Sequence, residues 1–110
     1  MKKEMIEPNK INDIIKRIVN NFNPEKIILF GSFASGKENN DSDIDLLIIQ
    51  DTNLPRHLRS FEIRKSLIGM MVPIDILVYN PEEFEKEKKE KFSFLNYALK
   101  TSKVLYESNR

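Results

Sequence analysis

Residues 27–49 read IILFGSFASGKENNDSDIDLLII, and this stretch decides the fold. Its two apolar runs, residues 27–30 and 46–49, have the length and composition of buried strands. A turn formed by Gly31 and Ser32 follows the first run. Ten residues separate this turn from the acids that enter the second run, so two strands should flank a polar loop.

Two alternate acids, Asp43 and Asp45, stand at the start of the second run. Because alternate residues of a strand point to the same face, both carboxylates should aim together, with Ile44 turned away. Paired carboxylates are hard oxygen ligands that suit Mg²⁺. Behind a Gly-Ser turn they have the layout of a metal-dependent phosphoryl or nucleotidyl transfer site.

A third strand is predicted over residues 72–79, in which Asp75 is the only charge. Alternation places Asp75 opposite an apolar face that should pack on helices. A lone acid in a strand more often marks an edge or a satisfied polar contact. If this strand neighbours the second, however, three carboxylates converge, and a divalent cation resolves their repulsion.

The remaining pattern alternates helices and strands and predicts one α/β (α+β) domain, 1–110, whose small mixed sheet is covered by helices on one side. A final strand is expected over 103–106. An amphipathic helix is expected from Pro8 to the region 20–24, and a second helix over 55–70 with Leu54, Leu58, Phe61 and Ile68 inward. A third helix should begin at the strong start signal Asn80-Pro81 and run through Lys91. One or two further helical turns are expected over 93–100.

Composition narrows the function classes. The 110 residues hold 18 Lys and Arg against 17 Asp and Glu, a net charge of +1 that gives no overall reason to expect nucleic acid as a partner. The absence of cysteine excludes disulfides and thiolate metal sites. The apolar runs are too short for a membrane span, and Met1 to Glu4 lead into no signal-type stretch. A cytoplasmic location is therefore expected.

Two other loop motifs fit less well. Residues 31–37 match most of the P-loop pattern, but Glu38 replaces the Ser or Thr that holds Mg²⁺, and the next residues are loop-like. Residues 41–45 resemble the start of an EF-hand, but Leu46 replaces its glycine and Thr52 its bidentate glutamate. Both readings are rejected.

The signature resembles the polymerase-β-type nucleotidyltransferase superfamily, and the short length with residues 94–107 resembles its minimal nucleotidyltransferase (MNT) branch. The signature is carried by Gly31, Ser32, Asp43, Asp45 and Asp75. Members of this branch are often encoded beside HEPN-domain proteins, and some are antitoxins that transfer AMP to a tyrosine of the HEPN toxin. The resemblance therefore implies an adenylyltransferase that uses ATP and a cognate HEPN toxin as its partner.

Nucleotidyl transfer assigns a role to each signature residue. Asp43 and Asp45 should hold Mg²⁺ or Mn²⁺ at the phosphates, and Asp75 should complete a second metal position or accept the proton of the attacking hydroxyl. Gly31 should permit close approach of the backbone, and the Ser32 hydroxyl should hold terminal phosphates.

Other polar and aromatic residues have ordinary explanations. Lys37 lies in a solvated loop, although it is long enough to reach a phosphate, and His57 is expected at the surface. A basic row on the third helix is either a partner surface or a solvated face. The aromatic residues near the C-terminus are expected in core or interface packing. The row is Arg56, Arg59, Arg64 and Lys65, and the aromatic residues are Phe92, Phe94, Tyr97 and Tyr106.

Three functions compete at this point: a protein adenylyltransferase antitoxin, an enzyme for a small hydroxylated acceptor such as an aminoglycoside, and a non-catalytic module that masks a toxin. One sheet and its cover use almost all residues, so the open acidic face should lack walls for a small acceptor. The first function is favoured, with the acceptor supplied by another protein. Homo- or hetero-oligomers are both compatible with the sequence.

Overall fold

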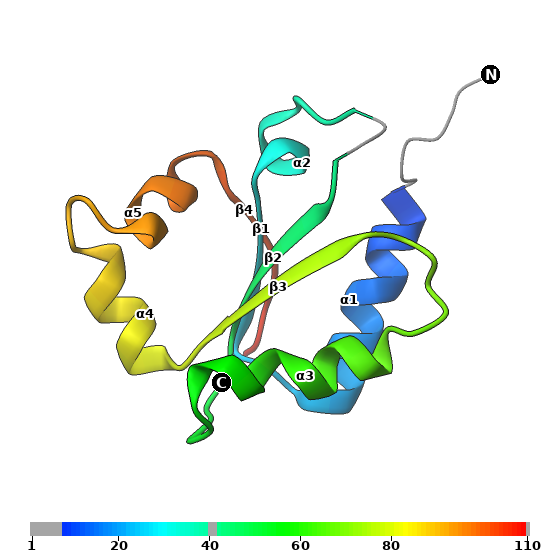
Figure 1. Ribbon diagram of the computed structural model, residues 1–110, viewed down its shortest axis with the longest axis horizontal. Coiled ribbons are helices and arrows are strands. Elements are labelled where there is room, and N and C mark those ends of the chain that lie inside the picture. Colours follow the sequence, from blue (N-terminus) through cyan, green and yellow to red (C-terminus); the bar gives the residue numbers. More distant parts are fainter. Residues whose placement is uncertain (1–7, 40–41, 110) are drawn as a thin grey trace.

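Four strands form one mixed sheet in the order β3-β2-β1-β4, with helices on both sides (Figure 1). The computed structural model describes residues 8–39 and 42–109; Asn40 and Asp41 of the predicted loop and the N-terminal Met1 to Glu4 lie outside the described residues. None of the described helices is long and apolar enough to cross a membrane. The elements are α1 (Pro8–Phe22), β1 (Lys26–Phe30), α2 (Ser32–Ser35), β2 (Ile44–Ile49), α3 (Arg56–Ser66), β3 (Ile74–Tyr79), α4 (Pro81–Lys88), α5 (Phe94–Ala98), the 3₁₀ turn η1 (Leu99–Thr101) and β4 (Lys103–Glu107).

The register of the sheet brings the predicted acids together. β1 pairs antiparallel with β2 and with β4, whereas β2 and β3 are parallel. Parallel neighbours need a crossover, and α3 supplies it. Asp45 lies directly opposite Asp75 in the β2–β3 pair and opposite Phe30 in the β1–β2 pair. The second and third strands are therefore neighbours, which is the condition for their acids to converge.

One face of the sheet packs on α1 and α3, to the right of the sheet in Figure 1. Ile44, Leu46 and Ile48 of β2 are fully buried there, beside Ile14 and Ile18 of α1. Full burial of such a side chain contributes about 1.5–3 kcal/mol, so these alternating residues fix which face of β2 points to solvent. The acids are left on the other face, as their spacing predicts.

The second face is half covered by α4 and α5, so helices pack on both faces of the sheet rather than on the one side predicted. Phe84 of α4 and Leu95 of α5 pack on Leu47 and Ile49. α4 begins with the predicted signals: the Asn80 side chain accepts from the amide of Glu83, and the Glu83 carboxylate accepts from the amide of Asn80. It ends at Lys88 rather than Lys91. The uncovered half of this face carries Asp45 and Asp75.

The predicted orientation of α3 is wrong. The residues expected inward, Leu54, Leu58, Phe61 and Ile68, are all exposed. The helix ends at Ser66, and Arg59, Ile63 and Leu67 face the core instead. Arg59 can face inward because its guanidinium donates to Glu83 and to the carbonyl oxygens of Leu54 and Val78. A hydrophobic pattern cannot foresee a buried arginine, since arginine is almost never fully buried unless paired.

Candidate active site

Gly31 brings the end of β1 against the Asp45 carboxylate. Its φ of +76° is a left-handed conformation that glycine adopts without strain. A Cβ built at this position would collide with the Asp45 side chain. The short helix α2 follows at once, with the amides of Ala34 and Ser35 donating to the Gly31 carbonyl oxygen at 3.1 Å. The predicted Gly-Ser turn is therefore part of the same local structure as the acids.

Asp45 is held in an electrostatically unfavourable place. Its side chain is half-buried, and burial raises the pKa of this carboxyl above its usual range. Repulsion from Asp75 and then from Asp43 raises the pKa of Asp45 further. Neighbouring negative charge of this kind is relieved when a cation binds. Asp43, just before β2, is exposed to solvent.

Asp75 has a partner that the sequence did not reveal. The Arg64 guanidinium donates to Asp75 Oδ1 at 3.2 Å. The same guanidinium donates to the carbonyl oxygens of Ile74 and Ile76, each at 3.4 Å. The eleven-residue separation between Arg64 and Asp75 has no local signal, because it spans the end of α3 and the whole turn into β3. Both side chains of the ion pair are about half exposed.

The acids fit a divalent cation in part. Within residues 8–39 and 42–109, no three acidic or imidazole side chains are gathered closely enough to form a ready metal cage. The three predicted acids are therefore neighbours on one face but do not form a preformed cage, since Asp75 pairs with Arg64. Asp43 and Asp45 nonetheless offer hard oxygen donors near Gly31, and Asp75 and Asp43 add to burial in raising the pKa of Asp45. This donor set suits Mg²⁺ with phosphate oxygens completing its shell.

The predicted basic row does not form one face. Arg59 is only 9% exposed and forms a two-pronged ion pair with Glu83, which lowers the pKa of Glu83 to about 2. Arg56 pairs with Glu87 at 2.9 Å and lies over the Tyr79 ring. Arg64 contacts Asp75, and Lys65 lies 3.7 Å from Glu62.

The other polar candidates lie at the surface, as predicted, and the aromatic residues are divided between the core and the surface. His57 and Lys37 are exposed. The Phe94 ring meets Phe30 edge-on with 5.7 Å between centroids, whereas Phe92 and Tyr97 are exposed. Tyr106 is partly buried against the first core, so core packing is confirmed for it and for Phe94 in part.

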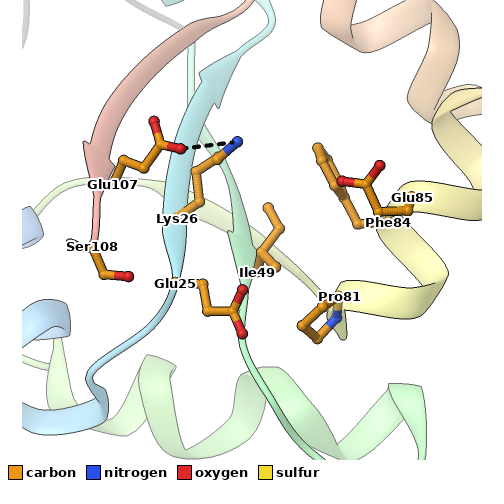
Figure 2. Close-up of a pocket in the computed structure, with 8 residues that line it drawn as sticks. All are labelled: Glu25, Lys26, Ile49, Pro81, Phe84, Glu85, Glu107 and Ser108. Carbon is orange, nitrogen blue, oxygen red and sulfur yellow. Dashed lines mark ion pairs between the residues drawn. The ribbon is translucent and has the colours of Figure 1, made fainter. Parts of the chain in front are cut away.

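The structure also has a hollow that lies apart from the signature acids. It lies at the opposite end of the strands, where β1 begins and β2 and β4 end, and is lined by Lys26, Ile49, Phe84 and Glu107 among others (Figure 2). Lys26 Nζ lies 3.6 Å from Glu107 Oε2 on the β1–β4 side of this hollow. The acids of the signature do not line it, so it is no candidate for the predicted site.

Residues 10–110 match the family model described as Polymerase beta, Nucleotidyltransferase, and the chain belongs to this family. It is 38% identical over 82 residues to a Methanocaldococcus jannaschii protein named "Putative protein adenylyltransferase", covering 74% of this chain and 78% of that protein. The protein is thus a nucleotidyltransferase, and the resemblance to the polymerase-β-type nucleotidyltransferase superfamily is confirmed.

Solved structures share the fold. The crystal structure of a putative nucleotidyltransferase from Sulfolobus solfataricus aligns with a TM-score of 0.66 at 18% identity, over 93% of this chain and 81% of the other. A toxin-antitoxin structure with AMP-PNP aligns with a TM-score of 0.62 at 22% identity, over 94% of this chain and 76% of that one. At these identities the likeness establishes the mixed α/β fold.

Proposed function

We propose that this nucleotidyltransferase moves AMP from ATP to a tyrosine hydroxyl of a cognate HEPN-domain toxin and thereby acts as its antitoxin. The observation that carries the proposal is the register of Asp45 opposite Asp75, with Asp45 packed on Gly31 and Asp43 two residues before it. The relative named for protein adenylyl transfer and the fold neighbour named as a toxin-antitoxin support the choice of acceptor. The reaction is expected in the cytoplasm.

The roles follow from the positions of the side chains. Asp43 and Asp45 would hold Mg²⁺ or Mn²⁺, whose chemistry is to neutralise charge that develops on the phosphate oxygens. Gly31 leaves the ATP phosphates free to approach the turn, where the Ser32 hydroxyl would bind them. Asp75 would accept the proton of the acceptor hydroxyl as its oxygen bonds to the α-phosphorus. The bond from that phosphorus to the bridging oxygen breaks, and pyrophosphate leaves.

A protein acceptor suits the open half of the sheet face. α4 and α5 cover the half that carries Leu47 and Ile49, whereas Asp75 remains exposed. Pockets for small acceptors bury most of their ligand between walls. A macromolecule supplies its own wall and can present a hydroxyl in line with the α-phosphate. A protein acceptor is therefore favoured over an aminoglycoside-type one.

The test is intact mass spectrometry of the cognate HEPN-domain protein, to be sought in the neighbouring reading frames, after incubation with this chain, ATP and Mg²⁺. The expected result is a gain of one or more adenylyl groups, located on a tyrosine by peptide mapping. The gain should disappear with Asp43→Asn. Toxin neutralisation without a change in mass, and equally good with Asp43→Asn, would replace the proposal by the masking module.

A further inference from the structure

The outer side of α3 carries apolar side chains that the fold does not use. Phe61 is 59% exposed and Ile68, just past the helix, is 77% exposed. Leu54 and Leu58 are also exposed, and these four residues are called the α3 patch. Single exposed apolar residues are ordinary, but a group along one helix is typical of an interaction surface. These are the same residues whose spacing predicted an inward face.

A groove lies beside the patch and leads to Asp75. It runs between α3 and the edge strand β3, with a volume of about 320 Å³, and is lined by Arg56, His57, Ser60 and Arg64 from α3 and by the residues from Asp75 to Tyr79. At roughly 100° per helical residue, His57 and Phe61 lie only about 40° apart around the helix. The patch and the groove are therefore adjacent surfaces of one helix.

Arginine side chains occupy the open edge of β3. Arg64 donates to the carbonyl oxygens of Ile74 and Ile76, and Arg59 donates to that of Val78. An unpaired edge invites another strand, and covering its hydrogen-bonding groups prevents that addition. A ligand in the groove would therefore meet guanidinium groups and side chains rather than a free backbone edge.

We propose that the α3 patch and this groove dock the acceptor protein, which places apolar side chains on the patch and an acidic residue beside its acceptor hydroxyl. This proposal rests on the proposed function. Of the two arginines that line the groove, Arg56 is already paired with Glu87, whereas the acid paired with Arg64 is the exposed Asp75, so the complementary group is a carboxylate that meets Arg64. This carboxylate takes Arg64 from Asp75, which then faces the acceptor hydroxyl.

The exchange is feasible because of where the ion pair lies. Arg64 and Asp75 are both about half exposed, and such pairs contribute little to stability. The apolar patch favours a protein over a polyanion, since nucleic-acid interfaces are polar and strongly charged. Continuity with Asp75 favours the acceptor protein over a second copy of this chain, because a second copy would close the groove to the acceptor.

The test compares Phe61→Asp/Ile68→Asp with a matched control, Phe92→Asp, in the turn before α5 at 94% exposure. The cognate HEPN-domain protein is titrated into each variant by calorimetry, and transfer is followed by intact mass. The patch variant should weaken partner binding and raise KM for the partner at least tenfold. Calorimetric ATP binding and Tm should stay at wild-type values, and the control should stay within twofold.

The outcomes separate this proposal from the proposed function. Wild-type binding by the patch variant would overturn the docking surface even if transfer occurs. Lost binding in the patch variant, in a pair that shows no transfer at all, would support the surface and contradict adenylyl transfer. A chain that is dimeric alone, and monomeric as the patch variant, would assign the surface to a second copy and overturn the proposal.

Discussion

At each end of the α3–β3 edge, an arginine of α3 donates to carbonyl oxygens of β3 and pairs with a carboxylate, but the two arginines differ in burial. At one end Arg59 is buried, donates to the Val78 carbonyl oxygen and forms a two-pronged pair with Glu83. At the other end Arg64 is exposed, donates to the Ile74 and Ile76 carbonyl oxygens and reaches only one oxygen of Asp75. The first end fixes α3 to α4, and the second leaves the acid exchangeable. Burial decides which arginine is structural.

Removing the acid at the exposed end should have the largest effect on activity. Asp75→Asn should lower the transfer rate about 10²–10⁴-fold, the usual contribution of a general base. ATP binding should be largely retained, and Tm should hold because the lost ion pair is exposed. Transfer and Tm are measured on the same preparation. A badly unfolded Asp75→Asn variant would show that Asp75, like Glu83, is needed for stability.

Breaking the buried end should instead affect stability. Glu83→Gln leaves the Arg59 guanidinium buried without an anion, which costs about 3 kcal/mol in the free energy of unfolding. Glu87→Gln, which removes a partner of the half-exposed Arg56, is the matched control and should cost less than about 1 kcal/mol. Urea unfolding measures both. Equal losses would show that burial does not distinguish the two pairs.

The same pair predicts the acid response. The pKa of Glu83 falls from 4.5 to about 2 on folding, mainly through its hydrogen bond from Arg59. A depressed folded pKa stabilises the native state above the unfolded pKa, and that stability is lost as pH falls from about 4.5 toward 2. Stability measured across this window should fall less steeply in Glu83→Gln. An unchanged slope would mean that other carboxylates dominate.

Gly31 separates backbone strain from contact with the acid. Gly31→Ala forces a left-handed φ on alanine and also drives a Cβ into the Asp45 carboxylate. Gly36→Ala imposes a similar φ of +79° with open space around the Cβ, so it should cost only about 1–2 kcal/mol. Gly31→Ala should cost more and also weaken ATP binding, as unfolding and calorimetry will show. Identical behaviour would mean that the contact with Asp45 is unimportant.

Arg64 should have the smallest effect on the isolated chain. Arg64→Ala removes an exposed pair, so stability should change by less than about 1 kcal/mol. KM for the partner should rise several-fold while KM for ATP does not, and Arg64→Lys should restore part of the loss because it keeps the charge. A fall in kcat alone, with an unchanged KM for the partner, would limit Arg64 to orienting Asp75.

Much of the fold could be predicted because it depends on local patterns. The apolar runs were sufficient to predict the strands, and their alternation placed Asp45 and Asp75 on one face. The capping signals at Asn80-Pro81 were sufficient to predict the start of α4. The orientation of α3 could not be predicted, since an inward Arg59 depends on Glu83, 24 residues away. The pairing of Arg64 with Asp75 could not be predicted for the same reason. Long-range ion pairs leave no periodic signal in a sequence.

The central claim is that the half of the sheet face left uncovered by α4 and α5 binds nucleotide through Asp43 and Asp45. The direct measurement is a calorimetric titration of Mg²⁺-ATP into the wild-type chain and into Asp43→Asn/Asp45→Asn. Burial and then repulsion from Asp75 and Asp43 raise the pKa of Asp45, so removal of its charge should leave the variant folded at least as well as wild type. The account predicts metal-dependent ATP binding by wild type and none by the folded variant. Equal binding by both would contradict it.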